Sequence, residues 1–158
     1  MMRKKKIYLE TTMFNYYFDR DREDYHVSTR SLFSEIKAGK YDPYTSAYVM
    51  NELEPAPKEK REMMLALIEQ YSINVLPISR EAEKLADMYI NNGTISRRAI
   101  IDARHIAMAA IYDIEVIVSL NFKHIVRDKT RYGVNSINRE NNFRSLIIRN
   151  PMEIVDVL

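Results

Sequence analysis

Three carboxylates and one amide occupy positions in the sequence that could carry metal-ion chemistry. Glu10 and Asn121 each directly follow a short apolar segment with the character of a buried strand. Glu52 comes shortly after another such segment, and Asp102 lies in the first turns of a helical segment that is apolar on nearly every side. Ligands of parallel sheets bind beyond the carboxyl ends of the strands, so we expect these four side chains to face one crevice.

Carboxylate oxygens favour hard cations, and Mg²⁺ or Mn²⁺ is therefore the expected occupant. The chain has no cysteine, so thiolate-based zinc or iron–sulfur sites are excluded. We predict that Glu10, Glu52 and Asp102 bind one or two such ions, directly or through water. Asn121 would position a water molecule or a phosphate. A metal ion held in this way activates water, orients a phosphate and stabilises charge on the leaving oxygen.

Each acid also has an ordinary structural explanation when it is considered alone. Asp102 would interact favourably with the N-terminus of its own helix, or pair with a neighbouring arginine. Glu52 alone is an exposed helix acid, and a glutamate after a strand, such as Glu10, is commonly a solvated loop residue. The convergence of all the polar groups at one predicted sheet edge favours the metal site.

Basic and hydroxyl side chains beside the same crevice are candidates for binding phosphate groups, because phosphate contacts supply most of the sequence-independent affinity for a nucleic acid. The hydroxyls belong to Thr11 and Thr12. The cationic candidates are Arg97, Arg98, Lys123, His124 and Arg127. The basic run at residues 3–6 precedes the first predicted strand, so it is expected at the opposite edge of the sheet. His105 follows Asp102 by three residues, and a single unit of this kind favours a hydrogen-bonded structural role over a ligand role.

The elements that must position these residues alternate along the chain. Strands are predicted at residues 5–9, 44–47, 73–78, 115–120, 134–137 and 145–148. Helices are predicted at 25–40, around Glu52, and at 58–71, 79–91 and 96–113, with a last turn or helix at 151–157. This order predicts an α/β fold, a three-layer α/β/α sandwich around a mainly parallel sheet.

Composition agrees with one ordinary domain spanning residues 1–158, because 46% of the 158 residues are hydrophobic. The net charge of +2 permits an RNA partner but does not demand one. No segment is long and apolar enough for a signal sequence or a membrane span, so we expect a soluble cytoplasmic protein with no membrane association.

Four ordered segments resemble the motifs of the PIN-domain family. They lie at residues 8–12, at 45–46 with 51–53, at 101–107 and at 117–125. In that family the first strand ends in an acid followed by two hydroxyl residues, a second acid precedes leucine, a third acid opens a helix, and a fourth polar residue follows the later strand. The C-terminal part further resembles the toxins of type II toxin–antitoxin pairs. The resemblance implies a metal-dependent endoribonuclease, a homodimer and an antitoxin partner.

Two residues depart from the family pattern, and they keep other functions open. The first acid is usually Asp and is Glu10 here, and the fourth position is often Asp and is Asn121 here. The site therefore carries one negative charge fewer than a four-acid site, and weaker metal affinity is expected. One alternative is a PIN-fold module that binds RNA or a protein with little or no cleavage. A hydrolase of small phosphate esters is a more distant alternative.

Overall fold

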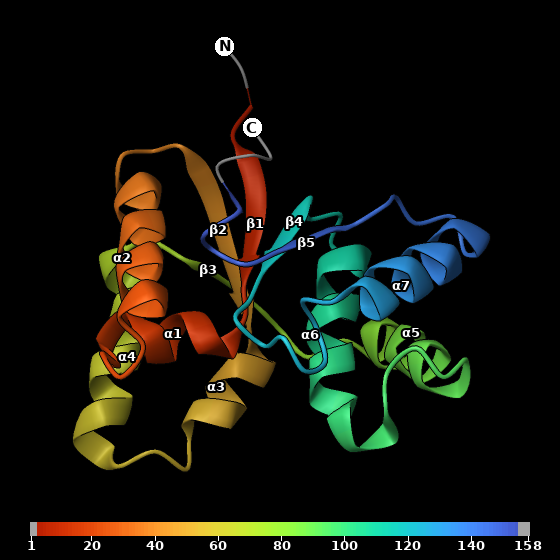
Figure 1. Ribbon diagram of the computed structural model, residues 1–158, viewed down its shortest axis with the longest axis horizontal. Coiled ribbons are helices and arrows are strands. Elements are labelled where there is room, and N and C mark those ends of the chain that lie inside the picture. The colour runs from red at the N-terminus through yellow and green to blue at the C-terminus, as the bar shows by residue number, and fades with distance from the viewer. Residues whose placement is uncertain (1–2, 155–158) are drawn as a thin grey trace.

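A computed structural model describes residues 3–154, which alternate between strands and helices around one parallel sheet (Figure 1). The five strands are β1 (Lys5–Leu9), β2 (Tyr41–Ser46), β3 (Asn74–Leu76), β4 (Val116–Val118) and β5 (Ile147–Arg149). Their order is β3-β2-β1-β4-β5, and every neighbouring pair is parallel. The predicted α/β class is confirmed, with β1 at the centre of the sheet.

The helices cover both faces of the sheet. They are α1 (Thr11–Phe18), α2 (Glu23–Lys37), α3 (Ala47–Leu53), α4 (Lys58–Gln70), α5 (Arg80–Asn91), α6 (Ile100–Ile111) and α7 (Asp128–Glu140), with a short 3-10 helix at Arg97–Ala99 before α6. Figure 1 shows α1, α2 and α4 on one side and α5, α6 and α7 on the other. The side chains of β1 alternate accordingly. Ile7 and Leu9 pack into the first layer and Tyr8 into the second, as the two-residue period of a strand requires.

The predicted strand at residues 134–137 is wrong, because these residues lie in the middle of α7. The buried residues of this helix are Thr130, Val134, Ile137 and Asn138, which recur every three to four residues. A half-buried strand would instead bury every second side chain. The strand was predicted from the two apolar residues at the ends of the segment, Val134 and Ile137. The other buried residues of this helix face, Thr130 and Asn138, are polar, so the hydrophobic pattern did not reveal the helical period.

The first helix of the structure, α1, was not predicted. Its sequence, TTMFNYYF, is rich in aromatic and β-branched residues that have only modest helix propensity. The helix begins because the Glu10 side chain accepts a hydrogen bond from the backbone N–H of Thr12 and so caps its first turn. The predicted turn at 151–157 is present as far as residue 154, and its remainder lies outside the described residues.

The ends of the parallel strands separate the basic N-terminal run from the predicted crevice. Lys5 and Lys6 lie at the amino end of β1, and Arg3 pairs with Glu115 at 2.7 Å just before β4. The carboxyl ends of β1, β2 and β4 meet at the opposite edge. Over residues 3–154, no helix combines the length and the hydrophobicity that crossing a membrane would need.

Candidate active site

Glu10 is held rigidly where β1 ends and α1 begins. The register pairs Leu9 with Val118, so Glu10 lies level with Ser119. Only 2% of Glu10 is exposed. Its Oε1 accepts hydrogen bonds from Thr12 N at 3.2 Å, Thr12 Oγ1 at 2.6 Å and Ser119 Oγ at 2.6 Å. All three fall on Oε1, which leaves Oε2 as the oxygen that could bind a cation.

Glu52 approaches the same point from α3, the short helix that follows β2. Ser46 caps this helix by accepting a hydrogen bond from Tyr48 N. The Oε1 atom of Glu52 accepts a hydrogen bond from Thr11 Oγ1 at 2.5 Å and lies 2.5 Å from His105 Nε2. About a third of the Glu52 side chain, 34%, is exposed. One oxygen of the Glu52 carboxylate is therefore fixed, on a side chain that is partly open to solvent.

A buried chain of hydrogen bonds orients Glu52 from behind. His105 is completely buried, and its Nδ1 lies 2.7 Å from Tyr8 Oη. The Tyr8 hydroxyl in turn lies 2.7 Å from Ser46 Oγ. Ser46, Tyr8, His105 and Glu52 thus form a continuous chain, called here the Ser46–Glu52 chain. Both ring nitrogens of His105 are engaged in it, which agrees with the predicted hydrogen-bonded role for this histidine.

Potential ligand atoms of Glu10, Glu52 and His105 all lie within 4.8 Å of one another. Distances of this size suit a single cation bound between the carboxylates. Because His105 already uses both nitrogens, the free oxygens of the two glutamates are the better ligands for a hard cation. The donor set therefore fits Mg²⁺ or Mn²⁺, with His105 acting through Glu52.

Asp102 lies outside this tight cluster but interacts with it electrostatically. It is on the first turn of α6 and is partly buried. Burial raises the pKa of its carboxyl, and the negative charge of Glu52 raises it further. The positive potential of His105 and His124 and a hydrogen bond with Asn121 oppose this rise in pKa. The structure therefore brings all three predicted acids to one edge of the sheet.

The two glutamates differ in how they accommodate their charge. Burial raises the pKa of the Glu10 carboxyl, although His105 and the donors Ser119 and Thr12 work against the shift. Burial also acts to raise the pKa of Glu52, but the hydrogen bond and charge of His105 and the hydrogen bond of Thr11 together hold it below its usual value. Burial therefore disfavours the ionised forms of Glu10 and Asp102, and a cation bound between them would offset this cost.

Asn121 takes part in the hydrogen bonding of the loop that follows β4. Its backbone N–H donates to Ser119 Oγ at 2.9 Å, and its Oδ1 accepts a hydrogen bond from His124 N at 3.0 Å. The amide is thus partly used to shape its own loop and contacts Asp102 as well. The ring atom Nδ1 of His124 is buried and, among the described residues, has no hydrogen-bond partner.

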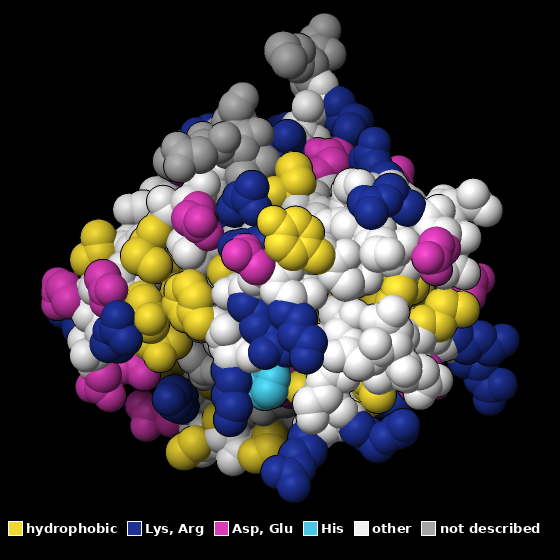
Figure 2. Space-filling model, turned by 45° about the vertical axis from the view of Figure 1, so that its right-hand side comes forward, with side chains coloured by type: hydrophobic (Ala, Val, Ile, Leu, Met, Phe, Trp, Pro, Cys, Tyr) yellow, Lys and Arg dark blue, Asp and Glu magenta, His cyan; other side chains and the backbone are white. Residues whose placement is uncertain are grey.

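The basic candidates differ in their availability for a phosphate. Arg97, Arg98 and Lys123 are exposed. Arg127 instead donates to Thr130 Oγ1 at 3.1 Å and to the backbone oxygen of Thr94 at 3.4 Å. Figure 2, which brings the side of α5, α6 and α7 forward, shows Lys and Arg side chains gathered around a histidine on this face.

Three contributors to the site were not predicted as members of it. Ser119 and Tyr8 were missed because their roles depend on partners that are 109 and 97 residues away along the chain. His105 contacts Glu52 across 53 residues. The available signals were modest: a polar hydroxyl at the end of a buried strand, and a histidine inside an apolar helix.

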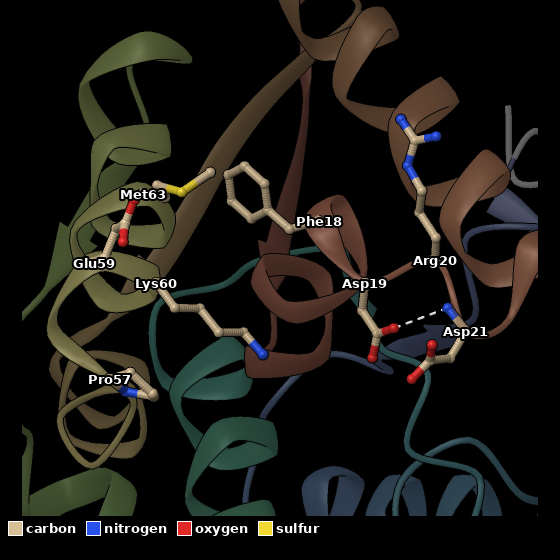
Figure 3. A pocket seen from close by; sticks show the side chains of 8 residues that line it. All are labelled: Phe18, Asp19, Arg20, Asp21, Pro57, Glu59, Lys60 and Met63. Carbon is tan, nitrogen blue, oxygen red and sulfur yellow. Dashed lines mark hydrogen bonds between the residues drawn. The ribbon is translucent and has the colours of Figure 1, made fainter.

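A separate groove of about 550 Å³ lies between the C-terminal end of α1 and the start of α4 (Figure 3). Phe18 and Met63 point toward each other across it, and the Asp19 carboxylate accepts a hydrogen bond from Asp21 N at 2.9 Å. It is lined by Phe18, Asp19, Arg20, Asp21, Pro57, Glu59, Lys60 and Met63. None of the three predicted metal-binding acids lines this groove.

The protein is therefore a parallel α/β sandwich with acidic side chains converging at the carboxyl edge of its sheet. Comparison with known families identifies the family to which it belongs. Residues 7–129 match the model of the PIN domain, and the chain belongs to this family. PIN-domain proteins are generally nucleases.

Solved structures give the same fold. VapC20 of Mycobacterium tuberculosis, described as a sarcin–ricin loop cleaving toxin, is 15% identical with a TM-score of 0.56, over 70% of this chain and 86% of that chain. VapBC2 from Rickettsia felis, bound to a DNA fragment from its promoter, is 15% identical with a TM-score of 0.54, over 92% of this chain and 98% of that chain. At this identity the likeness establishes the fold alone. No curated protein sequence matches the chain.

Proposed function

We propose that this PIN-domain protein is a metal-dependent endoribonuclease that hydrolyses phosphodiester bonds in RNA. The observation that carries the proposal is the convergence of Glu10, Glu52 and His105, with ligand atoms within 4.8 Å of one another at the carboxyl edge of the sheet. Asp102 adds a third carboxylate whose pKa is raised mainly by burial. Perturbed acids gathered at a sheet edge are a typical feature of catalytic sites.

In this proposal Glu10, Glu52 and Asp102 hold Mg²⁺ or Mn²⁺, with Asn121 beside them. When bound, the cation would provide a nucleophilic water at neutral pH and neutralise charge on the phosphate. The protein's own groups prepare the site for this. Thr11 and His105 fix one oxygen of Glu52, and Ser119 and Thr12 fix one oxygen of Glu10, so the remaining oxygens are already oriented.

Substrate binding falls to groups around this centre. Arg97, Arg98, Lys123 and His124 would contact phosphates of the RNA on either side of the bond that is cut. The Coulombic interaction of His124 with Asp102 supports a position for this side chain beside the acids. Thr11 and Thr12 would act mainly through the two glutamates, since their hydroxyls already donate to them.

We further propose that the protein is the cytoplasmic toxin of a toxin–antitoxin pair and works as a homodimer. The similarity of its fold to VapC20 and to VapBC2 supports this assignment. Two measurements test it: the mass of the purified chain in solution by light scattering, and the effect of a co-expressed candidate antitoxin on RNA cleavage. A monomer that no partner inhibits would refute both parts of this assignment.

Cleavage of labelled single-stranded and structured RNAs in Mn²⁺, Mg²⁺ or EDTA tests the enzymatic proposal. The variant Asp102→Asn keeps the size of the side chain and removes its charge. Asp87→Asn is the matched control, because Asp87 is an exposed acid on α5. We expect metal-dependent cleavage by the wild type and by Asp87→Asn, and at least a 100-fold loss in Asp102→Asn, typical of removing an essential electrostatic group.

Intact RNA under all conditions, together with no binding of Mn²⁺, would overturn the nuclease proposal. RNA binding that persists without cleavage would favour the alternative of a PIN-fold binding module. This alternative is supported by Glu10 and Asn121, which differ from the aspartates that the family usually has at the first position and often has at the fourth.

A further inference from the structure

We infer that Tyr17 and Tyr71 form an oxidation site, at which small one-electron oxidants join the two rings by a carbon–carbon bond and give a dityrosine cross-link. The cross-link would connect the last turn of α1 with the C-terminal end of α4, on the face of the sheet that both helices cover. The two tyrosines are not among the groups that we propose for metal or RNA binding, and the inference does not depend on nuclease activity.

The hydroxyl groups of the two tyrosines are in direct contact. The Oη atoms of Tyr17 and Tyr71 lie 2.6 Å apart, and the ring centroids are 5.8 Å apart with planes inclined at 72°. In dityrosine the new bond joins the ring carbons that neighbour the hydroxyl-bearing carbons. Contact between the hydroxyl groups therefore brings the reactive carbons of the two rings close to each other.

Neighbouring side chains hold the two rings in this arrangement. The ring of Phe33 packs against both, with its centroid 4.9 Å from that of Tyr17 and 4.8 Å from that of Tyr71. The guanidinium carbon of Arg30 lies 3.8 Å from the Tyr17 centroid, and Arg30 Nε donates to the backbone oxygen of Tyr17 at 2.7 Å. Tyr71 is the C-cap of α4, where the backbone leaves the helix, so its ring can approach Tyr17 without breaking the helix.

The composition of the chain directs one-electron oxidation to its tyrosines. The chain has no cysteine and no tryptophan, side chains that would compete for the oxidant or reduce a tyrosyl radical. Tyr17 is buried, whereas Tyr71 is only partly buried, so an oxidant has access to the pair through Tyr71. Two radicals held in contact within one molecule combine faster than radicals of separate molecules that must first meet.

The reaction removes one electron and one proton from each phenol. Burial and the hydrogen bond with Tyr17 raise the pKa of Tyr71, so its phenol still has its proton at neutral pH. The two radicals form a carbon–carbon bond, and the hydrogen atoms of the joined carbons move to the oxygens, which restores both hydroxyl groups. When persulfate is the oxidant, photoactivated by a ruthenium(II) bipyridyl complex, it takes up the two electrons and becomes two sulfate ions, while the two protons pass to the buffer.

Photo-oxidation of the purified protein with these reagents, in EDTA and without RNA, tests the inference. We expect the wild type to show dityrosine fluorescence in the monomer band of a denaturing gel. The fluorescence should be lost in Tyr17→Phe and in Tyr71→Phe, which keep the ring and lack the hydroxyl group. Tyr16→Phe is the matched control and should keep the fluorescence. The rings of Tyr16 and Tyr25 are 5.3 Å apart, but no hydrogen bond joins their hydroxyl groups in the described part of the chain.

Mass spectrometry of tryptic peptides locates the bond. Residues 7–20 and 62–80 form tryptic peptides, and Tyr71 is the one tyrosine of the second peptide. We expect the two peptides to be joined, with a mass equal to their sum less two hydrogen atoms, and fragmentation to place the bond at Tyr17. The cross-link closes a loop across residues 17–71 and restricts the unfolded chain, as a disulfide does. Oxidised wild type should therefore have a higher Tm than oxidised Tyr71→Phe, which undergoes the same methionine oxidation.

Several results would overturn the inference. One is dityrosine that persists in Tyr71→Phe. Another is dityrosine found only in cross-linked dimers, formed through an exposed ring such as Tyr132, which is 75% exposed. A third is an oxidised wild type in which the peptides 7–20 and 62–80 stay separate. Because RNA cleavage has no part in these measurements, failure of the nuclease proposal would leave the cross-link intact, and failure of the cross-link would leave the nuclease proposal unchanged.

Discussion

At the scale of single residues, the site is built from carboxylates that the fold stabilises only in part. Glu10 has three hydrogen bonds to one oxygen, yet burial still raises its pKa. An acid whose pKa is higher in the folded than in the unfolded chain binds a proton more readily in the fold. Its effect on stability is therefore most favourable below the unfolded pKa and is lost as pH rises through the folded one.

The variant Glu10→Gln should make the metal-free protein more stable at alkaline pH. Glutamine keeps an acceptor for Thr12 and Ser119 and removes the buried charge. We expect the Tm in EDTA to rise at pH 8, by roughly 2–4 °C for each kcal/mol recovered, and to change little near pH 4. Calorimetry at both pH values measures this, with Glu62→Gln on the exposed face of α4 as control. A Tm that falls equally at both pH values would mean that the hydrogen bonds outweigh the charge.

Tyr8→Phe should weaken metal binding although Tyr8 is not a proposed ligand. The change breaks the Ser46–Glu52 chain and leaves His105 Nδ1 without its partner, so Glu52 is less well oriented. We expect a 10- to 100-fold loss of Mn²⁺ affinity by calorimetric titration, typical of the partners that orient metal ligands, and a loss of about 1–3 kcal/mol in the free energy of unfolding.

Tyr89→Phe provides the control for this prediction. Tyr89 is also fully buried and donates a hydrogen bond to Asn138 Oδ1 at 2.6 Å, outside the Ser46–Glu52 chain. It should lose similar stability and keep its Mn²⁺ affinity. Equal affinity in both variants would show that the Ser46–Glu52 chain has a structural role only.

At the scale of secondary-structure elements, hydrophobic periodicity predicted the elements whose own residues show a clear apolar pattern. It failed where a structural role depends on residues of other elements. The strand positions before Glu10 and Asn121 were found because the last three residues of β1 and all three residues of β4 are apolar and buried. The helix α1 was missed because a side chain outside it provides its cap, and α7 was missed because half of its buried face is polar. His105 was identified as hydrogen-bonded, but its partners Tyr8 and Glu52 come from other elements that no periodicity connects.

Gly133 shows a constraint within α7 that propensity alone would misjudge. Alanine is favoured over glycine in a helix by about 1 kcal/mol. A Cβ at Gly133, however, would lie 2.2 Å from Oγ1, 2.5 Å from Cγ2 and 2.8 Å from Cβ of Thr94. Thr94 is buried and branched at Cβ, so it cannot move all three atoms away.

Gly133→Ala is therefore expected to lower the free energy of unfolding by about 1–3 kcal/mol, as overpacking does. Ser136→Ala, at an exposed position on the same helix, should leave stability unchanged or slightly higher. Urea denaturation of both variants measures the difference. A stabilised Gly133→Ala would mean that α7 can shift away from Thr94 without cost.

At the scale of the whole molecule, a bound cation would act as a ligand of the folded state alone, because its three proposed ligands come from α3, α6 and the end of β1. At a concentration 100 times its Kd such a ligand adds about 2.7 kcal/mol to the free energy of unfolding. The raised pKa values of Glu10 and Asp102 mean that protons compete for the same oxygens. Stabilisation by metal should therefore depend on pH.

We expect the rise in Tm produced by Mn²⁺ to be larger at pH 8 than at pH 5, because the raised pKa values of Glu10 and Asp102 let protons compete with the ion more strongly at the lower pH. Glu52, whose pKa is lowered, is already ionised over this range. Titration calorimetry in buffers with different ionisation enthalpies should detect proton release on binding. Binding of equal strength at both pH values would contradict the proposed ligand set, and EDTA should reverse the stabilisation in every case.

The central position of β1 has a consequence for synthesis of the protein. Glu10 is made early, but its donor Ser119 lies 109 residues further along the chain, and β4 must be added beside β1 before the two can meet. At typical rates of translation this takes roughly 5 to 20 seconds. Throughout that interval the nascent chain has no assembled site. The proposed nuclease activity could therefore act on the ribosome that makes the protein only after β4 has emerged.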